Sequence, residues 1–175
     1  MLDPDRYDTT VHDLVERHGA RLRALVGSRL QTSWVAWEVA ADDEWFQDEA
    51  VVLGFTEAQL EITCSHFDRL ALTWGEIDTT QPPAHAGMWK GSFELEWRPD
   101  SLPELAALRG ATLESIRVIE CGPVASVAGL TGKEWLLSGL EFTFSTGAVH
   151  VFNALDQVAV ETRLEPDSQL RPTEL

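Results

Sequence analysis

The residues best suited to chemistry form an acidic run that brackets two aromatic side chains. Its carboxylates and aromatics are Glu38, Asp42, Asp43, Glu44, Trp45, Phe46, Asp48 and Glu49. Tryptophan offers a partner apolar area and attracts Arg or Lys through its ring face, and surrounding acids attract the same cations. We therefore predict a partner-binding segment made of Asp42, Asp43, Glu44, Trp45, Phe46, Asp48 and Glu49. In the alternative interpretation, Trp45 and Phe46 fold back and cover a sheet edge.

Metal or acid–base chemistry is the weaker interpretation of the titratable residues. The acidic run lacks the alternate-residue ligand order and the central glycine of an EF-hand. His66, Asp68 and His150 could form a metal-dependent or small-molecule site, but their spacing matches no metal motif. Asp68 in a tight turn, and His150 on a strand surface or in a cleft, need no chemistry. We expect no catalytic residue, no metal and no cofactor.

The acidic residues are concentrated in one part of the sequence. The formal net charge is −16, and residues 34–78 hold eleven acids against Arg69 as their one base. Such a surface repels phosphate backbones and anionic membranes, so we expect no nucleic-acid and no membrane partner. It attracts a basic protein instead. In the simplest alternative, the acids only keep the protein soluble.

Length and composition indicate an ordinary folded protein. The chain has 175 residues, of which 44% are hydrophobic, and this is enough for one sizeable core. Its two cysteines, Cys64 and Cys121, match no disulfide framework or zinc ribbon and are expected to be buried thiols. The N-terminal segment lacks the features of a secretory signal, and no stretch is long enough to span a membrane. We expect a cytoplasmic location.

The same residue pattern occurs twice along the chain. Three pairs of segments match: 22–32 with 105–115, 53–56 with 140–143, and 67–72 with 155–160. Each half is expected to open with a helix that a glycine ends. The first helix is predicted from Thr10 to about Val26, followed by Gly27, and the second has Ser101 as its cap and Gly110 as its end.

Alternating apolar and polar residues after each helix predict consecutive antiparallel hairpins, with one face buried and one in water. We predict an α+β fold in which two similar helix-plus-antiparallel-meander units pack as one domain with pseudo-twofold symmetry. Its parts are unit one at about 10–78, a loop at 79–88, an extra strand at 89–97, unit two at about 101–163 and a flexible tail at 165–175, all within a single domain of residues 1–175.

Several strand segments carry a resemblance to other proteins. They are Trp45-Phe46-Gln47-Asp48, Val52-Leu53-Gly54-Phe55, Leu60-Glu61-Ile62, Leu72 to Asp78, Leu140 to Thr143 and Val151 to Asp156. In these the chain resembles small uncharacterised bacterial proteins, some of which are similar to immunity proteins of toxin systems. The resemblance implies a non-enzymatic cytosolic protein that neutralises a basic toxin by occupying its active-site cleft.

The first functional hypothesis is therefore an acidic protein-binding domain, in the manner of an immunity protein, that engages a basic protein through residues 38–49. The second is a small-molecule or metal-dependent enzyme with a cleft between the two units, which would use His66, Asp68 and His150. The third is a structural module that forms a homodimer. Charge and aromatic placement favour binding over catalysis.

Overall fold

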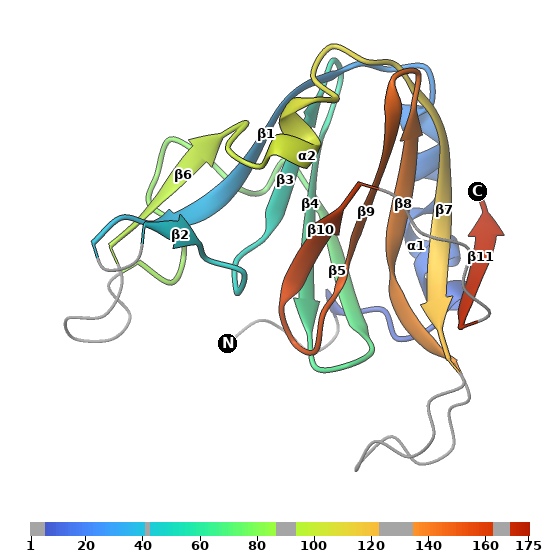
Figure 1. The fold of residues 1–175 in the computed structure, drawn as a ribbon. Helices are drawn as coiled ribbons and strands as arrows, with labels where there is room; N and C mark the ends of the chain where they lie inside the picture. Colours follow the sequence, from blue (N-terminus) through green and yellow to red (C-terminus); the bar gives the residue numbers. More distant parts are fainter. Residues whose placement is uncertain (1–5, 41–42, 87–93, 123–134, 163–168) are drawn as a thin grey trace.

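The computed structural model describes residues 6–40, 43–86, 94–122, 135–162 and 169–175, which form two antiparallel sheets and two helices (Figure 1). The predicted antiparallel strands are confirmed. The helical share is smaller than an α+β class implies, because the second helix is a single turn. The fold is therefore mainly β. No helix in the described ranges combines the length and apolarity needed to cross a membrane.

The first sheet is built on β1, which has neighbours along both of its edges. Its strands are β1 (Leu30–Glu38), β2 (Glu44–Trp45), β3 (Val51–Phe55), β4 (Gln59–Ser65), β5 (Arg69–Trp74) and β6 (Leu95–Pro99). The order is β2-β1-β3-β4-β5, and β6 pairs with the second half of β1.

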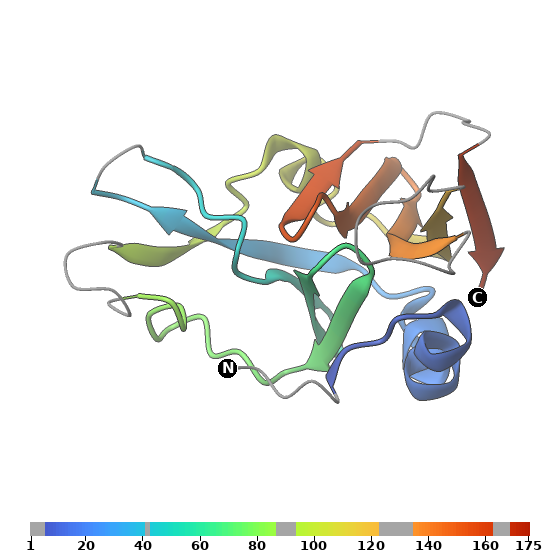
Figure 2. The same ribbon diagram turned by 90° about the horizontal axis from the view of Figure 1, so that it is seen from below.

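The second sheet has the order β10-β9-β8-β7-β11. Its strands are β7 (Leu113–Cys121), β8 (Leu136–Phe144), β9 (Gly147–Asn153), β10 (Val158–Glu161) and β11 (Leu170–Glu174). The two sheets lie against each other with α1 beside them (Figure 2). Their facing sides share one apolar core, in which the rings of Phe55 and Phe144 stack with centroids 6.4 Å apart.

The helix α1 (Val11–Leu25) matches the predicted helix to within one residue at each end. Thr10 caps it by accepting a hydrogen bond from the Asp13 backbone N–H, and Leu14, Leu22 and Leu25 on one stripe are buried. The helix packs on β7 of the second sheet, while α2 (Pro103–Ala106) packs on β1 of the first. Each helix therefore packs on a strand of the other half of the chain.

The predicted capping role of Ser101 is wrong. Leu102 occupies the N-cap position of α2, and no side chain caps this helix. The Ser101 hydroxyl donates instead to the backbone carbonyl of Arg98, at 3.4 Å. A one-turn helix gains little from a cap, because most of its polar backbone groups lack intrahelical partners in any case.

The two sheets share one pairing scheme. The pairing of β1 with β3 shifts register directly after the first residue of β1, and the pairing of β7 with β8 shifts directly after the first residue of β7. Leu30 pairs with Phe55 and Leu113 pairs with Phe144, so Phe55 corresponds to Phe144. The sequence matched Phe55 with Phe142 instead. A slip of two residues leaves every side chain on the same face of its strand, so alternation of apolar residues could not detect it.

In each sheet, one further strand pairs with the long first strand, β6 with β1 and β11 with β7. Two predictions about these strands need correction. The described part of the extra strand predicted at 89–97 is β6, which covers Leu95–Pro99 and pairs with β1, while residues 89–93 lie outside the described residues. The tail predicted as flexible contains β11 at Leu170–Glu174, which pairs with β7 as β6 does with β1. The tail showed no period because an edge strand buries little on either face, and because Pro172 breaks the usual composition of a strand.

The prediction of one buried and one wet face is wrong for the middle of the first sheet. Every residue of β3 is buried, and Glu61 on β4 is fully buried although its neighbours in sequence face the core. Residues 76 and 77 contact this outer side. The backbone N–H groups of Glu76 and Ile77 donate to the Glu61 carboxylate, and the His85 N–H donates to Glu49.

Two glycines join the sheets at their shared corner. The Gly27 N–H donates to the Leu113 carbonyl at 2.8 Å, and the Gly110 N–H donates to the Leu30 carbonyl at 2.7 Å. Gly27 has a φ of 91° and Gly110 a φ of 81°, a backbone conformation that residues with a Cβ rarely adopt. Gly27 directly follows the C-cap of α1, as predicted, whereas α2 ends at Ala106 and thus before the predicted end at Gly110. Each glycine bonds to the first strand residue of the other sheet.

We expect Gly27→Ala and Gly110→Ala each to lower the free energy of unfolding by about 1–2 kcal/mol. No atom lies within 4 Å of a Cβ added at either position, so the cost comes from the backbone conformation alone. Urea denaturation measures it. The matched control is Gly147→Ala, where φ is ordinary and the new Cβ meets only Leu108 at 3.4 Å. Stability unchanged in either junction variant would contradict this prediction.

Candidate functional site

The structure disperses the predicted acidic segment over several contacts. Asp42 lies outside the described residues. Asp43 and Glu44 are exposed, and Glu49 is buried and accepts from His85 Nδ1 at 2.9 Å. Exposed Asp48 accepts from Gln157 of the second half at 3.2 Å.

The two aromatics of the segment contribute to packing. Trp45 is half-buried in β2, pairs with Trp37 and packs against the core. Phe46 is half-buried, and its ring centroid lies 6.0 Å from that of His85. These contacts correspond to the interpretation in which both aromatics cover the sheet. The partner-binding role of the segment stays a prediction.

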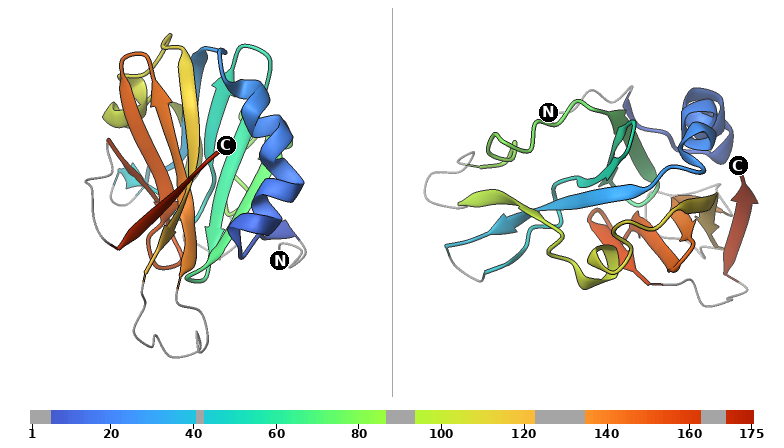
Figure 3. Two further views of the ribbon diagram at one scale, coloured as in Figure 1. Left: turned by 90° about the vertical axis from the view of Figure 1, so that its right-hand side faces the viewer. Right: turned by 90° about the horizontal axis from the view of Figure 1, so that it is seen from above.

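The acidic residues that do stand together belong to a projection that we call the arm: residues 34–38 of β1, 43–45 around β2, and 94–99 around β6. Figure 3 shows this end of β1 extending past the second sheet together with β2 and β6. Four carboxylates on the arm are exposed, namely Asp43, Glu44, Glu94 and Glu96. Sequence analysis placed the first two in the predicted binding segment. Glu94 and Glu96 join them only through the pairing of β6 with β1.

Arg98 is the one base among the described residues of the arm, and it organises the acids around it. Its Nη1 donates to Asp43 Oδ1 at 2.9 Å and its Nε donates to Glu96 Oε1 at 2.7 Å. The guanidinium lies 4.9 Å from the centroid of the Trp37 ring, and Trp37 Nε1 also donates to Asp43. The Trp37 hydrogen bond, followed by that of Arg98, lowers the pKa of Asp43, so this carboxylate stays ionised.

Glu44 and Glu94 differ from the other two acids of the arm. In the part of the chain that the structure describes, neither has an ion-pair partner. Arg98 therefore leaves an excess of negative charge on the arm, and both carboxylates are exposed to an approaching cation.

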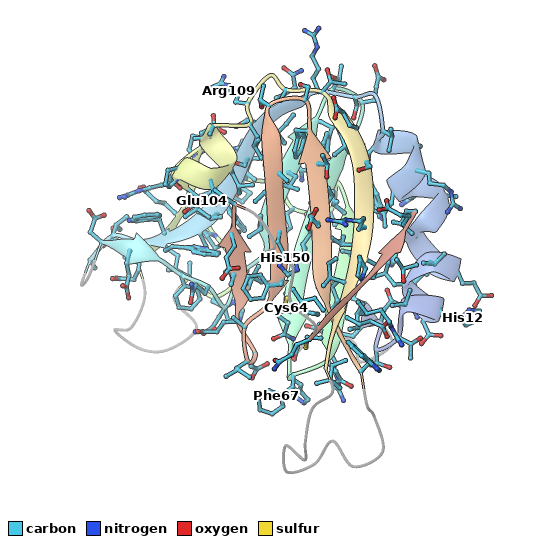
Figure 4. The ribbon with its side chains drawn as sticks, turned by 45° about the vertical axis from the view of Figure 1, so that its right-hand side comes forward. His12, Cys64, Phe67, Glu104, Arg109 and His150 are labelled. Carbon is cyan, nitrogen blue, oxygen red and sulfur yellow. The ribbon has the colours of Figure 1, made fainter. Side chains whose placement is uncertain are left out.

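The structure does not bring His66, Asp68 and His150 together. His66 is exposed at the β4–β5 turn, where its backbone N–H donates to the side chain of Asp156 and its Nδ1 lies 3.8 Å from the same carboxylate. His150 lies within β9, among the strands of the second sheet (Figure 4). Among the described residues, no group of three or more His, Cys, Asp or Glu side chains is arranged to hold a metal ion.

A second polar feature crosses the outer side of the second sheet, and sequence analysis missed it. Five directly paired residues form what we call the charged row: Glu174, Arg117, Glu141, His150 and Glu161. They lie opposite the core, because their neighbours on each central strand face inward. The sequence shows these residues on five separate strands, and only the pairing register aligns them.

The centre of the charged row is buried and incompletely hydrogen-bonded. Glu141 is 4% exposed and His150 is 2% exposed. Arg117 Nη2 donates to Glu141 Oε1, while Glu141 Oε2 and both ring nitrogens of His150 have no hydrogen-bond partner among the described residues. Buried polar atoms without partners typically cost about 1–3 kcal/mol each. The prediction placed His150 on a strand surface or in a cleft, whereas its side chain is buried.

Burial also determines the charge of His150. Its ring stacks on Phe152 with centroids 4.6 Å apart, and desolvation lowers its pKa to about 4. The imidazole is thus neutral near neutral pH, with one nitrogen able to donate and the other able to accept. The charged groups that face it across the paired strands are Glu141 on β8 and Glu161 on β10.

The corresponding place in the first sheet has no such unpaired atoms. Glu61 stands on β4 where His150 stands on β9. Its carboxylate accepts from the side chains of Gln59 and Thr73 and from two backbone N–H groups of residues 76–77. Its partner on β3 is the apolar Val52. Hydrogen bonds therefore satisfy the polar side chain at this position of the first sheet, whereas the side chain at the same position of the second sheet has unpaired nitrogens among the described residues.

No protein-family model, curated protein or solved structure matched this chain. The candidate sites therefore rest on geometry and charge alone.

We expect the His150→Phe variant to gain stability over the wild type as the pH falls. The unfolded chain takes up a proton at His150 below its ordinary pKa of about 6.5, whereas the folded chain resists it until about 4. Wild-type stability is thus lost on acidification through this window, by about 2 kcal/mol between about pH 7.5 and pH 5. Phenylalanine keeps the ring and removes the titration.

Urea denaturation at the two pH values measures the difference between variant and wild type. The control is His12→Phe, because the His12 side chain is 85% exposed. We expect its difference from the wild type to stay constant with pH. An unchanged difference for His150→Phe as well would show that His150 titrates normally in the folded protein.

Proposed function

We propose that this protein is an acidic, non-enzymatic binding domain that engages a basic protein partner through the arm. The observation that carries the proposal is the set of four exposed carboxylates, Asp43, Glu44, Glu94 and Glu96, around the single guanidinium of Arg98. The net charge of −16 supports it, because the wider field attracts a basic protein from a distance.

The arm offers a partner more than charge. Trp37 and Trp97 are half-buried on β1 and β6, so part of each indole is available for apolar contact. An incoming Arg or Lys can pair with Glu44 and Glu94 without displacing Arg98. Asp43 and Glu96 are already held in position by Arg98, which reduces the ordering that binding requires.

We further propose that the partner is a toxin-like protein with a basic cleft, which this chain neutralises as an immunity protein does. A projecting acidic arm suits insertion into a concave basic surface. Electrostatic attraction of this kind speeds association, and neutralisation inside a cell requires fast association.

We also infer that the two sheets are copies of one unit, related by a pseudo-twofold axis near the bridge between Arg29 and Thr112. The shared registers, the further strands β6 and β11, and the exchanged hydrogen bonds of Gly27 and Gly110 support this. Places where the copies differ are then places where one copy has specialised. Glu61 on β4 and His150 on β9 stand at one such place.

A matched pair of charge-reversal variants tests the arm. We expect Glu44→Lys with Glu94→Lys to weaken binding of the basic partner at least about tenfold at low salt. Neither side chain has an ion-pair partner among the described residues, so the fold should be unaffected. The measurement is a quantitative pull-down from the source organism, followed by titration of the recovered basic protein at several salt concentrations.

The control is Glu57→Lys with Glu114→Lys, two exposed positions outside the arm that change the net charge by the same amount. We expect the control to change affinity less than about threefold, as exposed charges far from a contact do. Equal losses in both variants would mean that net charge alone attracts the partner. Recovery of no basic partner with the wild-type bait would contradict the proposal as a whole.

A further inference from the structure

The charged row carries more negative than positive groups, and its neutral histidine does not change that balance. Glu141, Glu161 and Glu174 face a single guanidinium, that of Arg117. Arg117 donates to one oxygen of Glu141 and lies 3.8 Å from Glu174. Arg117 is thus shared between Glu141 and Glu174, and among the described residues no cation is paired with Glu161.

The unpaired atoms lie on the β10 side of the row. Arg117 satisfies Oε1 of Glu141, while Oε2 of Glu141 and both nitrogens of His150 have no hydrogen-bond partner among the described residues. Next to them across β10 stands Glu161, which is exposed. A ligand that fits must supply N–H donors to the carboxylates, and an anion is disfavoured by both glutamates.

The aromatic surroundings suit a flat cation. His150 and Phe152 stack with their ring planes 12° apart, so they present parallel faces on the same side of β9. A guanidinium stacks on such faces, and a planar donor fork matches a carboxylate. β10 is a four-residue edge strand, and its exposed Glu161 lies beside the buried centre of the row.

We propose that the β10 side of the charged row binds the cationic side chain, arginine or lysine, of a protein partner. Glu141 and Glu161 accept its hydrogen bonds, and His150 contributes a neutral ring nitrogen. This proposal rests on the proposed basic partner, but the row lies on the second sheet and the arm on the first. The charged row would be a second contact with the partner. It would bind one cationic side chain, whereas the arm would attract the basic surface as a whole.

The test uses NMR of the histidine ring signals in the full chain, titrated with N-acetyl-arginine amide. His150 is assigned by loss of its signals in His150→Phe. We expect its signals to shift and saturate with a dissociation constant of about 10 mM or lower. N-acetyl-lysine amide distinguishes the ammonium from the guanidinium. N-acetyl-citrulline amide has nearly the shape of arginine without the charge, and it should leave His150 unaffected.

Two variants locate the contact. Glu141→Gln keeps the shape of the buried side chain and removes its charge, and we expect arginine binding to weaken at least about tenfold. Glu161→Gln is exposed and should fold normally even if the Glu141 variant does not, and we expect a loss of about threefold. Glu16→Gln on the exposed side of α1 is the control and should bind as the wild type does.

Absence of a saturable shift at His150 with both the arginine and the lysine compound would overturn the proposal. Equal shifts with the citrulline compound would do the same, because charge would then play no part. These outcomes are independent of the arm. The row can bind arginine amide while the arm variants retain their partner, and the arm can lose its partner while the row still binds the amide.

Discussion

The architecture depends on the two backbone hydrogen bonds that Gly27 and Gly110 exchange with the opposite sheet. Each bond starts in the connection between a helix and the next strand and reaches the residue where a strand of the other half begins. This fixes the corner at which both sheets start, and with it the packing of α1 on β7 and of α2 on β1. The contacts are non-local along the chain, so neither sheet has a complete core without the other. Both connections use a glycine because the backbone is left-handed at the residue that makes the bond.

The outer sides of the two sheets differ in how their buried polar side chains are hydrogen-bonded. In the first sheet, the buried carboxylate of Glu61 takes four hydrogen bonds, and these hold residues 75–77 against the strands. In the second sheet, the same strand position carries His150, whose nitrogens are unpaired among the described residues. A satisfied buried carboxylate makes the structure rigid, while an unsatisfied imidazole costs stability. Retaining the imidazole makes physical sense where the polar atoms meet a ligand, and this is the basis for assigning the charged row a role.

Short-range patterns in the sequence were enough to predict the first helix and several strands. Thr10, Gly27 and the apolar stripe of α1 act within a few residues, so the helix and its ends were predictable. The alternation in β4 and β9 likewise identified strands. β11 could not be found this way, because its pairing with β7 joins residues that are distant in sequence and because Pro172 is atypical of strands. The same limit applies to the sites. Glu141 and His150 were visible as residues, but the alignment of Arg117 with them depends on the pairing of β7 with β8, whose register shifts twice.

The arm and the charged row use charge in different physical settings. On the arm, Glu44 and Glu94 are exposed, so water and salt screen them and their attraction acts mainly on the rate of encounter. In the row, Glu141 is buried and screened far less, so a cation that reaches it is held more strongly and released more slowly. Each site also has its own guanidinium, Arg98 or Arg117, which prevents the acids from repelling one another in the free protein. On the proposed function, salt should therefore slow association through the arm while leaving dissociation from the row nearly unchanged.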